Sequence, residues 1–232
     1  MPFDEVKRPG GPGGSAHERA INLPPALMWL IGINLAVHLV RQLLSEQADQ
    51  SLVLALGLIP ASYTGDPPGE WWSLVLAPIT YQFIHGGWVH LGVNMITLAA
   101  FGAPVERLFG SARFVAFYLS AGIVAGLIHV LIFSSSPDPV IGASGAISGL
   151  FGAVLMTLRR IGRLNSLLPV AGLWIVLNVV LGLYGDGPGT GGSPVAWTAH
   201  IGGFVYGLLA FHLFVPKALR APPESDDGDS DS

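Results

Sequence analysis

Residues 142–158 read GASGAISGLFGAVLMTL, and residues 199–207 read AHIGGFVYG. Each stretch has two glycines four positions apart: Gly145 and Gly149 in the first, Gly203 and Gly207 in the second. This spacing puts both glycines on one face of a helix and lets the backbones of two membrane helices approach closely. The two stretches therefore predict a tightly packed helix pair, in which Ser144 and His200 lie near the same end.

The composition of the chain also indicates a membrane protein. Of its 232 residues, 51% are hydrophobic and 11% are charged, whereas roughly 25% of the residues in a soluble domain are charged. About 20 apolar residues cross a bilayer as a helix. The chain has six apolar runs at or near this length, at residues 24–44, 88–103, 114–133, 144–158, 167–183 and 195–215. We therefore predict an all-α membrane protein with a six-transmembrane-helix bundle, rather than a soluble enzyme or a disordered chain.

The lysines and arginines predict the orientation of this bundle, because they concentrate on the cytoplasmic side of spanning helices. Ten of the eleven fall before the first run, between the second and third, between the fourth and fifth, or after the sixth. Only Arg41 departs from this pattern, and we expect it to snorkel outward from the end of the first helix. The predicted bundle therefore has both termini in the cytoplasm.

Outside the helices, the chain divides into a head, a tail and one long connection. Residues 1–23 and the acidic residues 216–232 have the composition of disordered cytoplasmic ends on either side of a membrane domain at residues 24–215. The connection at residues 45–87 contains an apolar stretch that is too short to span a membrane. We interpret it as an interfacial or partly re-entrant loop, anchored by Trp71 and Trp72.

Several function classes are excluded by what the chain lacks. With 11 Lys and Arg against 15 Asp and Glu, it has no basic surface for nucleic acid. It has no cysteine, and its histidines do not occur at the spacings of metal ligands. We therefore expect no metal, no other cofactor and no nucleic-acid partner.

His90 and Asn94 are candidates for chemistry, because polar side chains are costly inside a membrane. They are four residues apart in the run at 88–103 and therefore share one helix face. Hydrogen bonding to a neighbouring helix and a functional role explain such a pair equally well.

Ser144 and His200 form a second candidate pair. Ser144 begins its helix, where free N–H groups and the helix dipole favour a developing anion, although serine is also a common N-cap. Close packing at the glycines would bring the imidazole within hydrogen-bonding distance of the hydroxyl, as an activated nucleophile requires. The nearest acids lie in loops or at helix ends: Asp138, Asp186 and Glu106. We therefore expect a Ser-His dyad rather than a triad.

Four motifs in this order resemble those of the rhomboid family of intramembrane serine proteases, over about residues 71–213. They are the segment 83–95 with its H-x-x-x-N spacing, G-x-S-G at 142–145, A-H-x-x-G-x-x-x-G at 199–207, and the segment 102–107. The last of these resembles the turn at the inner end of the family's second helix. Together the motifs fall on three of the six predicted helix regions, those at 88–103, 144–158 and 195–215.

The resemblance implies a role for each candidate residue. Ser144 would be the nucleophile and His200 the general base, and His90, Asn94 and the Ser144 backbone N–H would form the oxyanion hole. The helix at 167–183, with the loop after it, would control lateral access of the substrate. Supporting positions would be His85, which orders the outer loop and nearby water, and the motif glycines Gly142, Gly145, Gly203 and Gly207.

Two positions depart from the family pattern. Many members have Trp-Arg in the first loop, where this chain has Trp72-Ser73, so the resemblance does not predict how this loop docks. Many also have an aromatic residue four positions after the nucleophile, which stacks on the catalytic imidazole. This chain has Ser148 there, so we expect either a less firmly held imidazole or another ring in its place.

The sequence therefore predicts an intramembrane serine endopeptidase that cleaves single-span membrane protein substrates near the outer membrane interface. The alternatives are a non-catalytic six-helix membrane transporter and a rhomboid-like binding scaffold. The expected partners are transmembrane protein substrates and the lipid bilayer, in a bacterial-type plasma membrane by default. No particular oligomeric state is indicated.

Overall fold

The computed structural model describes residues 23–65, 71–184 and 196–219, and these residues form an all-helical fold. The α-helices are, in order, α1 (Pro25–Gln42), α2 (Glu46–Leu56), α3 (Trp71–Thr80), α4 (Trp88–Phe109), α5 (Ser111–Ile132), α6 (Ser144–Arg160), α7 (Leu168–Tyr184) and α8 (Trp197–Phe214). Three short 3-10 helices are η1 (Pro60–Tyr63), η2 (Tyr81–Phe83) and η3 (Lys217–Leu219). The predicted disordered head and acidic tail lie almost entirely outside the described residues.

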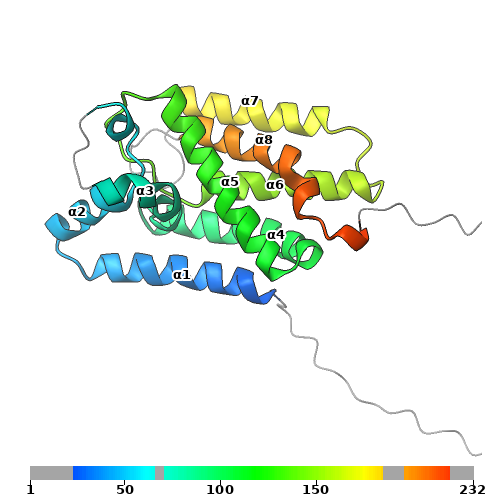
Figure 1. Ribbon diagram of the computed structural model, residues 1–232, viewed down its shortest axis with the longest axis horizontal. Coiled ribbons are helices and arrows are strands. Elements are labelled where there is room, and N and C mark those ends of the chain that lie inside the picture. The colour runs from blue at the N-terminus through cyan, green and yellow to red at the C-terminus, as the bar shows by residue number, and fades with distance from the viewer. Residues whose placement is uncertain (1–22, 66–70, 185–195, 220–232) are drawn as a thin grey trace, which may run out of the picture.

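The six predicted apolar runs all form helices, which pack as a bundle around α6 (Figure 1). α6 contacts α4, α5 and α8, and its contact with α8 is the most extensive of any helix pair. α1 packs against α4 and α5, and α7 packs chiefly against α8. α2 and α3 lie together at the end of the bundle where α6 begins (left in Figure 1). The serine-bearing helix is therefore surrounded by protein, while α1 and α7 form outer sides of the bundle.

Large apolar side chains cover much of the outer surface of the bundle. The most exposed include Trp29, Ile96, Leu131, Leu168 and Leu209. An apolar surface of this kind suits lipid rather than water. By length and composition, α4, α5 and α8 can each cross a membrane, and α7 is apolar but shorter. The chain is therefore an integral membrane protein, while the number of spans and their orientation stay predictions.

The connection at residues 45–87, predicted as a loop, instead contains α2 and α3. Ser45 caps α2 by accepting a hydrogen bond from the Ala48 N–H, as serine at this position commonly does. Between the two helices, Leu58 pairs with Val140 through backbone hydrogen bonds of 3.1 and 2.8 Å. The connection is thereby tied to the segment that precedes Ser144.

Arg41 is buried and does not snorkel outward, so that prediction is wrong. α2 folds back on α1, and the Asp49 carboxylate accepts from Arg41 Nε at 2.6 Å and from Nη2 at 2.9 Å. Arg41 Nη1 donates to the His85 carbonyl oxygen at 2.6 Å. The guanidinium stays inside because a carboxylate and a carbonyl oxygen satisfy it there.

We predict that Asp49→Ala lowers the melting temperature of the purified protein in detergent, because it removes the carboxylate that pairs with the buried Arg41. The free energy of unfolding should fall by about 2 kcal/mol. Breaking a fully buried ion pair costs roughly 3–5 kcal/mol, but 32% of the Asp49 side chain is exposed. The exposed Glu46, also in α2, offers the matched control Glu46→Ala, which should have little effect. Equal melting temperatures for the two variants would contradict this role of Asp49.

The stabilisation of the fold by the Arg41–Asp49 pair should depend on pH. The hydrogen bond from Arg41 lowers the pKa of the Asp49 carboxyl. A carboxyl with a lowered pKa in the folded state stabilises the fold at pH values above its unfolded pKa of about 3.9. The difference in melting temperature between the wild type and Asp49→Ala should therefore be largest at neutral pH and shrink as the pH falls below about 4.

The turn predicted at residues 102–107 is wrong, because α4 continues through Pro104 and ends at Phe109, with Gly110 as its C-cap at φ 80°. Glu106, in the last turn of α4, is buried, and its carboxylate accepts from the N–H groups of Ala26 at 3.0 Å and Leu27 at 2.7 Å. These N–H groups begin α1, where they lack helical partners and the dipole favours negative charge. α4 therefore holds the first turn of α1 in place.

Candidate active site

The glycines predicted to pair two helices lie in the contact between α6 and α8. A Cβ atom on Gly203 would collide with the Gly145 carbonyl oxygen, and one on Gly207 with the Gly149 carbonyl oxygen. The main chains of the two helices therefore touch, and only glycine fits at these two positions of α8. The predicted close packing is confirmed.

This close approach brings Ser144 and His200 into contact. Ser144 is the first residue of α6, and His200 lies in the first turn of α8. Ser144 Oγ and His200 Nε2 are 2.8 Å apart, a good hydrogen-bonding distance. When the ring proton is on Nδ1, Nε2 accepts from the hydroxyl, which is the arrangement of a nucleophile with its general base.

His90 presents a hydrogen-bond donor beside Ser144. Its Nδ1 accepts the Gly86 N–H at 3.3 Å, so the proton of the neutral ring is on Nε2. The point that a Cβ on Gly142 would occupy is 3.0 Å from this Nε2 and 3.8 Å from Ser144 Oγ. Gly142 has φ 120°, a conformation that L side chains rarely adopt. Glycine at this position therefore leaves space between the His90 donor and the Ser144 hydroxyl.

Asn94 follows His90 by four residues along α4 and lines the same cavity. Its Nδ2 donates to the His90 carbonyl oxygen at 2.9 Å, which leaves one of its two amide hydrogens for another acceptor. The Ser144 N–H opens α6 and has no acceptor within the helix. Three donors, from His90, Asn94 and the Ser144 main chain, are thus available at one site.

His85 is buried and supports the residue in front of the nucleophile. Its Nε2 accepts the Ala143 N–H at 3.4 Å, and its ring meets His90 edge-on, with 5.2 Å between the centroids. Burial lowers the pKa of His85 to about 3, so the ring is neutral at pH 7 and its Nε2 can accept this bond. Because Arg41 binds the His85 carbonyl oxygen, contacts run from α1 through His85 to Ala143.

Asn178 is a residue of this site that was not predicted from the sequence. It lies on α7, and its Oδ1 is 2.8 Å from His200 Nδ1. Its Nδ2 donates to the Trp174 carbonyl oxygen at 2.8 Å. An asparagine within an apolar helix is a signal of a functional residue that the sequence did offer. Its spacing along the chain, however, does not indicate His200 as its partner.

The position occupied by Ser148 does not restrain the imidazole. The Ser148 hydroxyl donates to the Ser144 carbonyl oxygen at 2.8 Å. Within the described part of the chain, no aromatic ring pairs with His200, so the substitute ring expected from the sequence is not found. The second ring nitrogen of His200 instead contacts the Asn178 amide.

Trp72 and Ser73, the other departure from the family pattern, lie in α3. Two hydrogen bonds dock this helix on the rest of the connection. The Tyr63 hydroxyl donates to the Leu74 carbonyl oxygen at 2.8 Å, and the Thr80 hydroxyl donates to the Leu56 carbonyl oxygen at 2.7 Å. α3 is therefore docked by contacts to α2 and η1.

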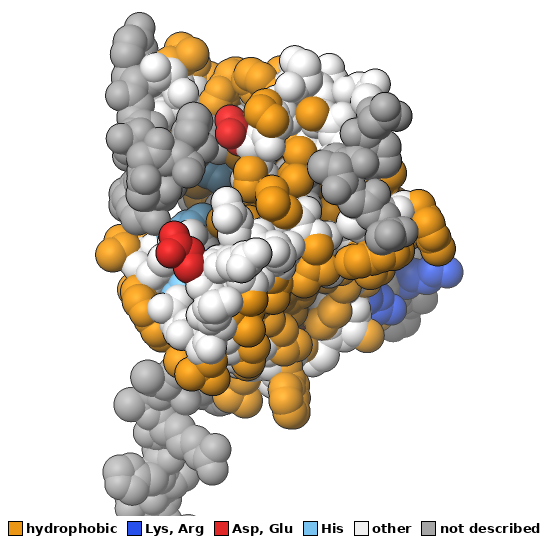
Figure 2. All heavy atoms as spheres, turned by 90° about the vertical axis from the view of Figure 1, so that its left-hand side faces the viewer, with side chains coloured by type: hydrophobic (Ala, Val, Ile, Leu, Met, Phe, Trp, Pro, Cys, Tyr) orange, Lys and Arg blue, Asp and Glu red, His pale blue; other side chains and the backbone are white. Residues whose placement is uncertain are grey.

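Ser144, His200, His90 and Asn94 line one cavity of about 1120 Å³. Residues of α7 and α8, among them Trp174, and the segment 138–142 before Ser144 also line it. Figure 2 looks onto the end of the bundle that carries α2 and α3, where histidine and acidic side chains reach the surface among apolar ones. Polar groups are therefore accessible at the end of the bundle where α6 begins.

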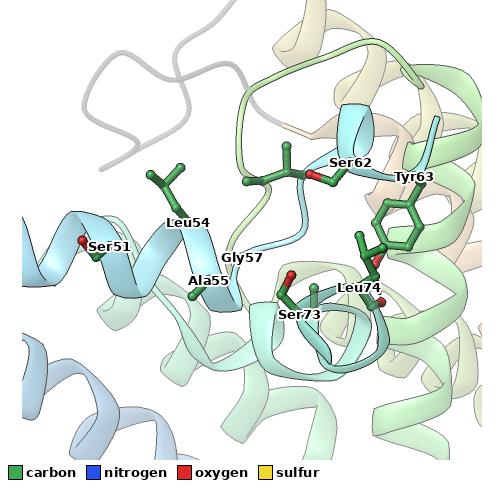
Figure 3. A pocket seen from close by; sticks show the side chains of 10 residues that line it. Ser51, Leu54, Ala55, Gly57, Ser62, Tyr63, Ser73 and Leu74 are labelled. Atoms are coloured by element: carbon green, nitrogen blue, oxygen red, sulfur yellow. Dashed lines mark hydrogen bonds between the residues drawn. The ribbon is translucent and has the colours of Figure 1, made fainter. Parts of the chain in front are cut away.

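A second cavity, of about 260 Å³, lies between α2, η1 and α3 (Figure 3). The described side chains that line it include hydroxyls but no histidine and no acid: Ser51, Ser62, Tyr63 and Ser73. A hydroxyl without a base is a weak nucleophile. The larger cavity is therefore the candidate active site.

A model of the rhomboid domain matches residues 68–217 of the chain. The chain is 40% identical over 151 residues to rhomboid protease GluP of Bacillus subtilis, and the aligned region covers 65% of the chain and 27% of GluP. It is 36% identical over 149 residues to RHOMBOID-like protein 5 of Arabidopsis thaliana, or 63% of the chain and 45% of that protein. It is 30% identical over 225 residues to Rhomboid-related protein 2 of Mus musculus, or 88% of the chain and 70% of that protein.

The chain spans about a quarter of GluP and less than half of the Arabidopsis protein. The matched domain nevertheless covers more than half of the chain and includes the helices that carry His90, Asn94, Ser144, Asn178 and His200. The chain therefore belongs to the rhomboid family.

Proposed function

We propose that the chain is an intramembrane serine endopeptidase that cleaves single-span membrane proteins near the outer membrane interface. The observation that carries this proposal is the 2.8 Å distance between Ser144 Oγ and His200 Nε2, in a cavity between apolar helices. The similarity to proteins named rhomboid proteases supports it.

In the proposed reaction, Ser144 Oγ attacks the carbonyl carbon of the scissile peptide bond. His200 Nε2 takes the hydroxyl proton and passes it to the leaving nitrogen as the carbon–nitrogen bond breaks. Water then attacks the acyl-enzyme and gives a proton to His200. The bond between Ser144 and the substrate carbon breaks, the new carboxylic acid leaves, and the Ser144 hydroxyl regains its proton.

The negative charge that develops on the substrate carbonyl oxygen would be stabilised by three donors. These are His90 Nε2–H, the free Asn94 amide hydrogen and the Ser144 main-chain N–H. Donors of this kind contribute about 3–4 kcal/mol each in serine proteases. The space over Gly142, between His90 and Ser144, suits the substrate carbonyl group.

We predict that His90→Ala and Asn94→Ala each lower kcat by about 10²-fold, because each removes one of these donors. KM should change by less than about threefold, since the ground-state carbonyl gains little from either donor. Kinetics with a single-span substrate in detergent would measure both values. Unchanged kcat in both variants would return this pair to a purely structural role between helices.

The proposed membrane topology is six spans, α1 and α4 to α8, with both termini in the cytoplasm. The start of α1 and the end of α8 lie at the same end of the bundle (right in Figure 1), which supports an even number of spans. The expected substrate has small or helix-weakening residues near the outer interface, where its backbone can unfold locally. A bacterial-type plasma membrane is the proposed location.

Covalent labelling tests the proposed function directly. The purified full chain in detergent is incubated with an electrophilic serine-hydrolase probe, an isocoumarin or a fluorophosphonate, and the adduct is located by peptide mapping and mass spectrometry. Ser144 should be labelled, and His200→Ala should prevent labelling because an unassisted hydroxyl is a weak nucleophile. Internal controls in the same experiment are Ser120, Ser134, Ser135, Ser136 and Ser148.

The labelling result separates the enzyme from its alternatives. A transporter or a binding scaffold offers no reason for one serine to react selectively. No adduct at Ser144 with several probe chemistries, or equal labelling of His200→Ala, would therefore contradict the proposal.

A further inference from the structure

We infer that Asn178 is a positioning residue of the active site, whose side-chain amide fixes the tautomer and the rotation of the His200 ring. Ser144, His200 and Asn178 then act as a triad, in place of the dyad expected from the sequence. This inference rests on the proposed function, because it assigns a role to the base of the same reaction.

The orientation of the Asn178 amide follows from its two neighbours. One end of the amide faces the Trp174 carbonyl oxygen at 2.8 Å, and a carbonyl oxygen can only accept. That end must therefore be the nitrogen, which leaves the oxygen facing His200 Nδ1 at 2.8 Å. Residues 174 and 178 are one helical turn apart, so the backbone of α7 itself sets which way the amide points.

The amide oxygen in turn decides where the His200 proton lies. An oxygen acceptor at 2.8 Å from Nδ1 requires a proton on Nδ1. In the neutral ring, Nε2 then carries a lone pair, and it faces Ser144 Oγ at 2.8 Å. This is the tautomer that a general base needs, and the other tautomer would place a donor against the hydroxyl it must deprotonate.

The burial pattern of α7 points to the same role. Of the described side chains of α7, only Asn178 is buried, with 4% of it exposed. Apolar residues around it, among them Leu173, Val176 and Leu177, are exposed. An asparagine on this helix would be costly in lipid, so α7 is rotated with its polar residue against α8. The helix therefore buries the Asn178 side chain against His200, the proposed general base.

The other contacts around His200 leave this task to Asn178. Ser148, one turn beyond the nucleophile, donates to the Ser144 carbonyl oxygen. Among the described residues, no ring pairs with the imidazole. Among the described side chains, Ser144 contacts Nε2 of the ring and Asn178 contacts Nδ1. Without the amide, the ring would lose the one partner that the described residues give it on the Nδ1 side.

Two substitutions at this position separate positioning from packing. Asn178→Leu keeps the size of the side chain and removes the acceptor, and it should lower kcat on the order of 10²-fold with KM within about threefold. Asn178→Asp should recover most of the activity. An aspartate keeps an oxygen acceptor for Nδ1–H, and its protonated form can also donate to the Trp174 carbonyl oxygen.

Asn34 provides a matched control. It is also a buried asparagine in an apolar helix, and its Nδ2 donates to the carbonyl oxygen four residues earlier, that of Leu30, at 2.8 Å. It lies on α1, which packs against α4 and α5 rather than against His200. Asn34→Leu should therefore leave kcat unchanged per folded molecule.

A spectroscopic measurement reads the tautomer without activity. Histidine is labelled with nitrogen-15, and the His200 ring signals are assigned by their loss in His200→Ala. The wild type should show a protonated Nδ1 and an unprotonated Nε2, and Asn178→Leu should show a mixture of the two tautomers. An unprotonated Nδ1 in the wild type, or the same tautomer in both proteins, would overturn the inference.

The kinetic outcomes keep the inference apart from the proposed function. If the wild type neither cleaves substrate nor labels at Ser144, the proposed function itself fails. If the wild type is active and Ser144→Ala is not, full kcat in folded Asn178→Leu overturns only the role of Asn178. A loss that lies entirely in KM, or no recovery in Asn178→Asp, would also overturn it.

Discussion

Ser144→Ala and His200→Ala are each expected to lower kcat for a single-span substrate by on the order of 10⁴-fold or more. Each removes one of the two groups that form and break bonds in the proposed reaction. Their side chains meet at 2.8 Å, so neither group should act efficiently alone. Cleavage by purified protein in detergent measures the loss, and unchanged melting temperatures would show that both variants remain folded.

Two residues of the same types serve as controls. Ser120 lies on α5 and its hydroxyl is 2.6 Å from the Tyr206 hydroxyl. His212 lies on α8, as His200 does, but near the opposite end of the helix. Ser120→Ala and His212→Ala should keep wild-type turnover within about threefold. Substantial turnover by Ser144→Ala would mean that another nucleophile does the chemistry.

Gly203→Leu is expected to lower kcat by about 10²-fold or more without removing any reacting group. A Cβ at this position collides with the Gly145 carbonyl oxygen, one residue after the nucleophile. A leucine must therefore push α6 and α8 apart, and the distance between Ser144 Oγ and His200 Nε2 must grow. Kinetics and probe labelling of the same preparation would measure the effect.

The leucine is large enough to disturb folding, so a smaller change is tested beside it. Gly203→Ala adds only the colliding Cβ and should lose activity in the same direction, by a smaller factor. Gly32 lies in α1, and apart from the adjoining backbone of α1 no heavy atom of the described residues is within 4 Å of its Cβ position, so Gly32→Leu should leave kcat unchanged. Wild-type kcat in folded Gly203→Leu would mean that this contact does not set the spacing of the two catalytic side chains.

The parts of the fold that the sequence predicted well were those with a short-range signal. Six apolar runs became helices, because apolar length alone decides whether a segment can be buried in lipid. The contact of α6 with α8 followed from glycines repeated at the same interval in both helices. The pairing of Ser144 with His200 could then be predicted, because both residues precede the glycine pair of their own helix.

The errors arose where a distant residue decided the outcome. Arg41 was expected at the membrane surface, since a lone cation at a helix end usually reaches water. Its burial depends on α2 folding back to bring Asp49 to it, which no local pattern shows. The family resemblance implied a turn at residues 102–107, but α4 continues through Pro104, and Glu106 beyond it holds α1.

Asn178 was overlooked for a related reason. A single asparagine does not show a helical period, so the face of α7 that meets α8 could not be derived from the run of apolar residues around it. Its partner is 22 residues away along the chain, on the next helix. Only the rotation of α7 in the folded bundle joins the amide to the His200 ring.

The contact between α6 and α8 also limits how this protein can diverge. A new Cβ at Gly102 would meet the side chains of Leu27 and Phe114, and a second substitution that shortens Leu27 can make room for it. A new Cβ at Gly203 meets a main-chain oxygen, and every amino acid carries one. No second substitution on α6 can restore that space, so Gly203 has no compensating partner. Natural and laboratory variation should therefore remodel the rest of the bundle while leaving this helix contact unaltered.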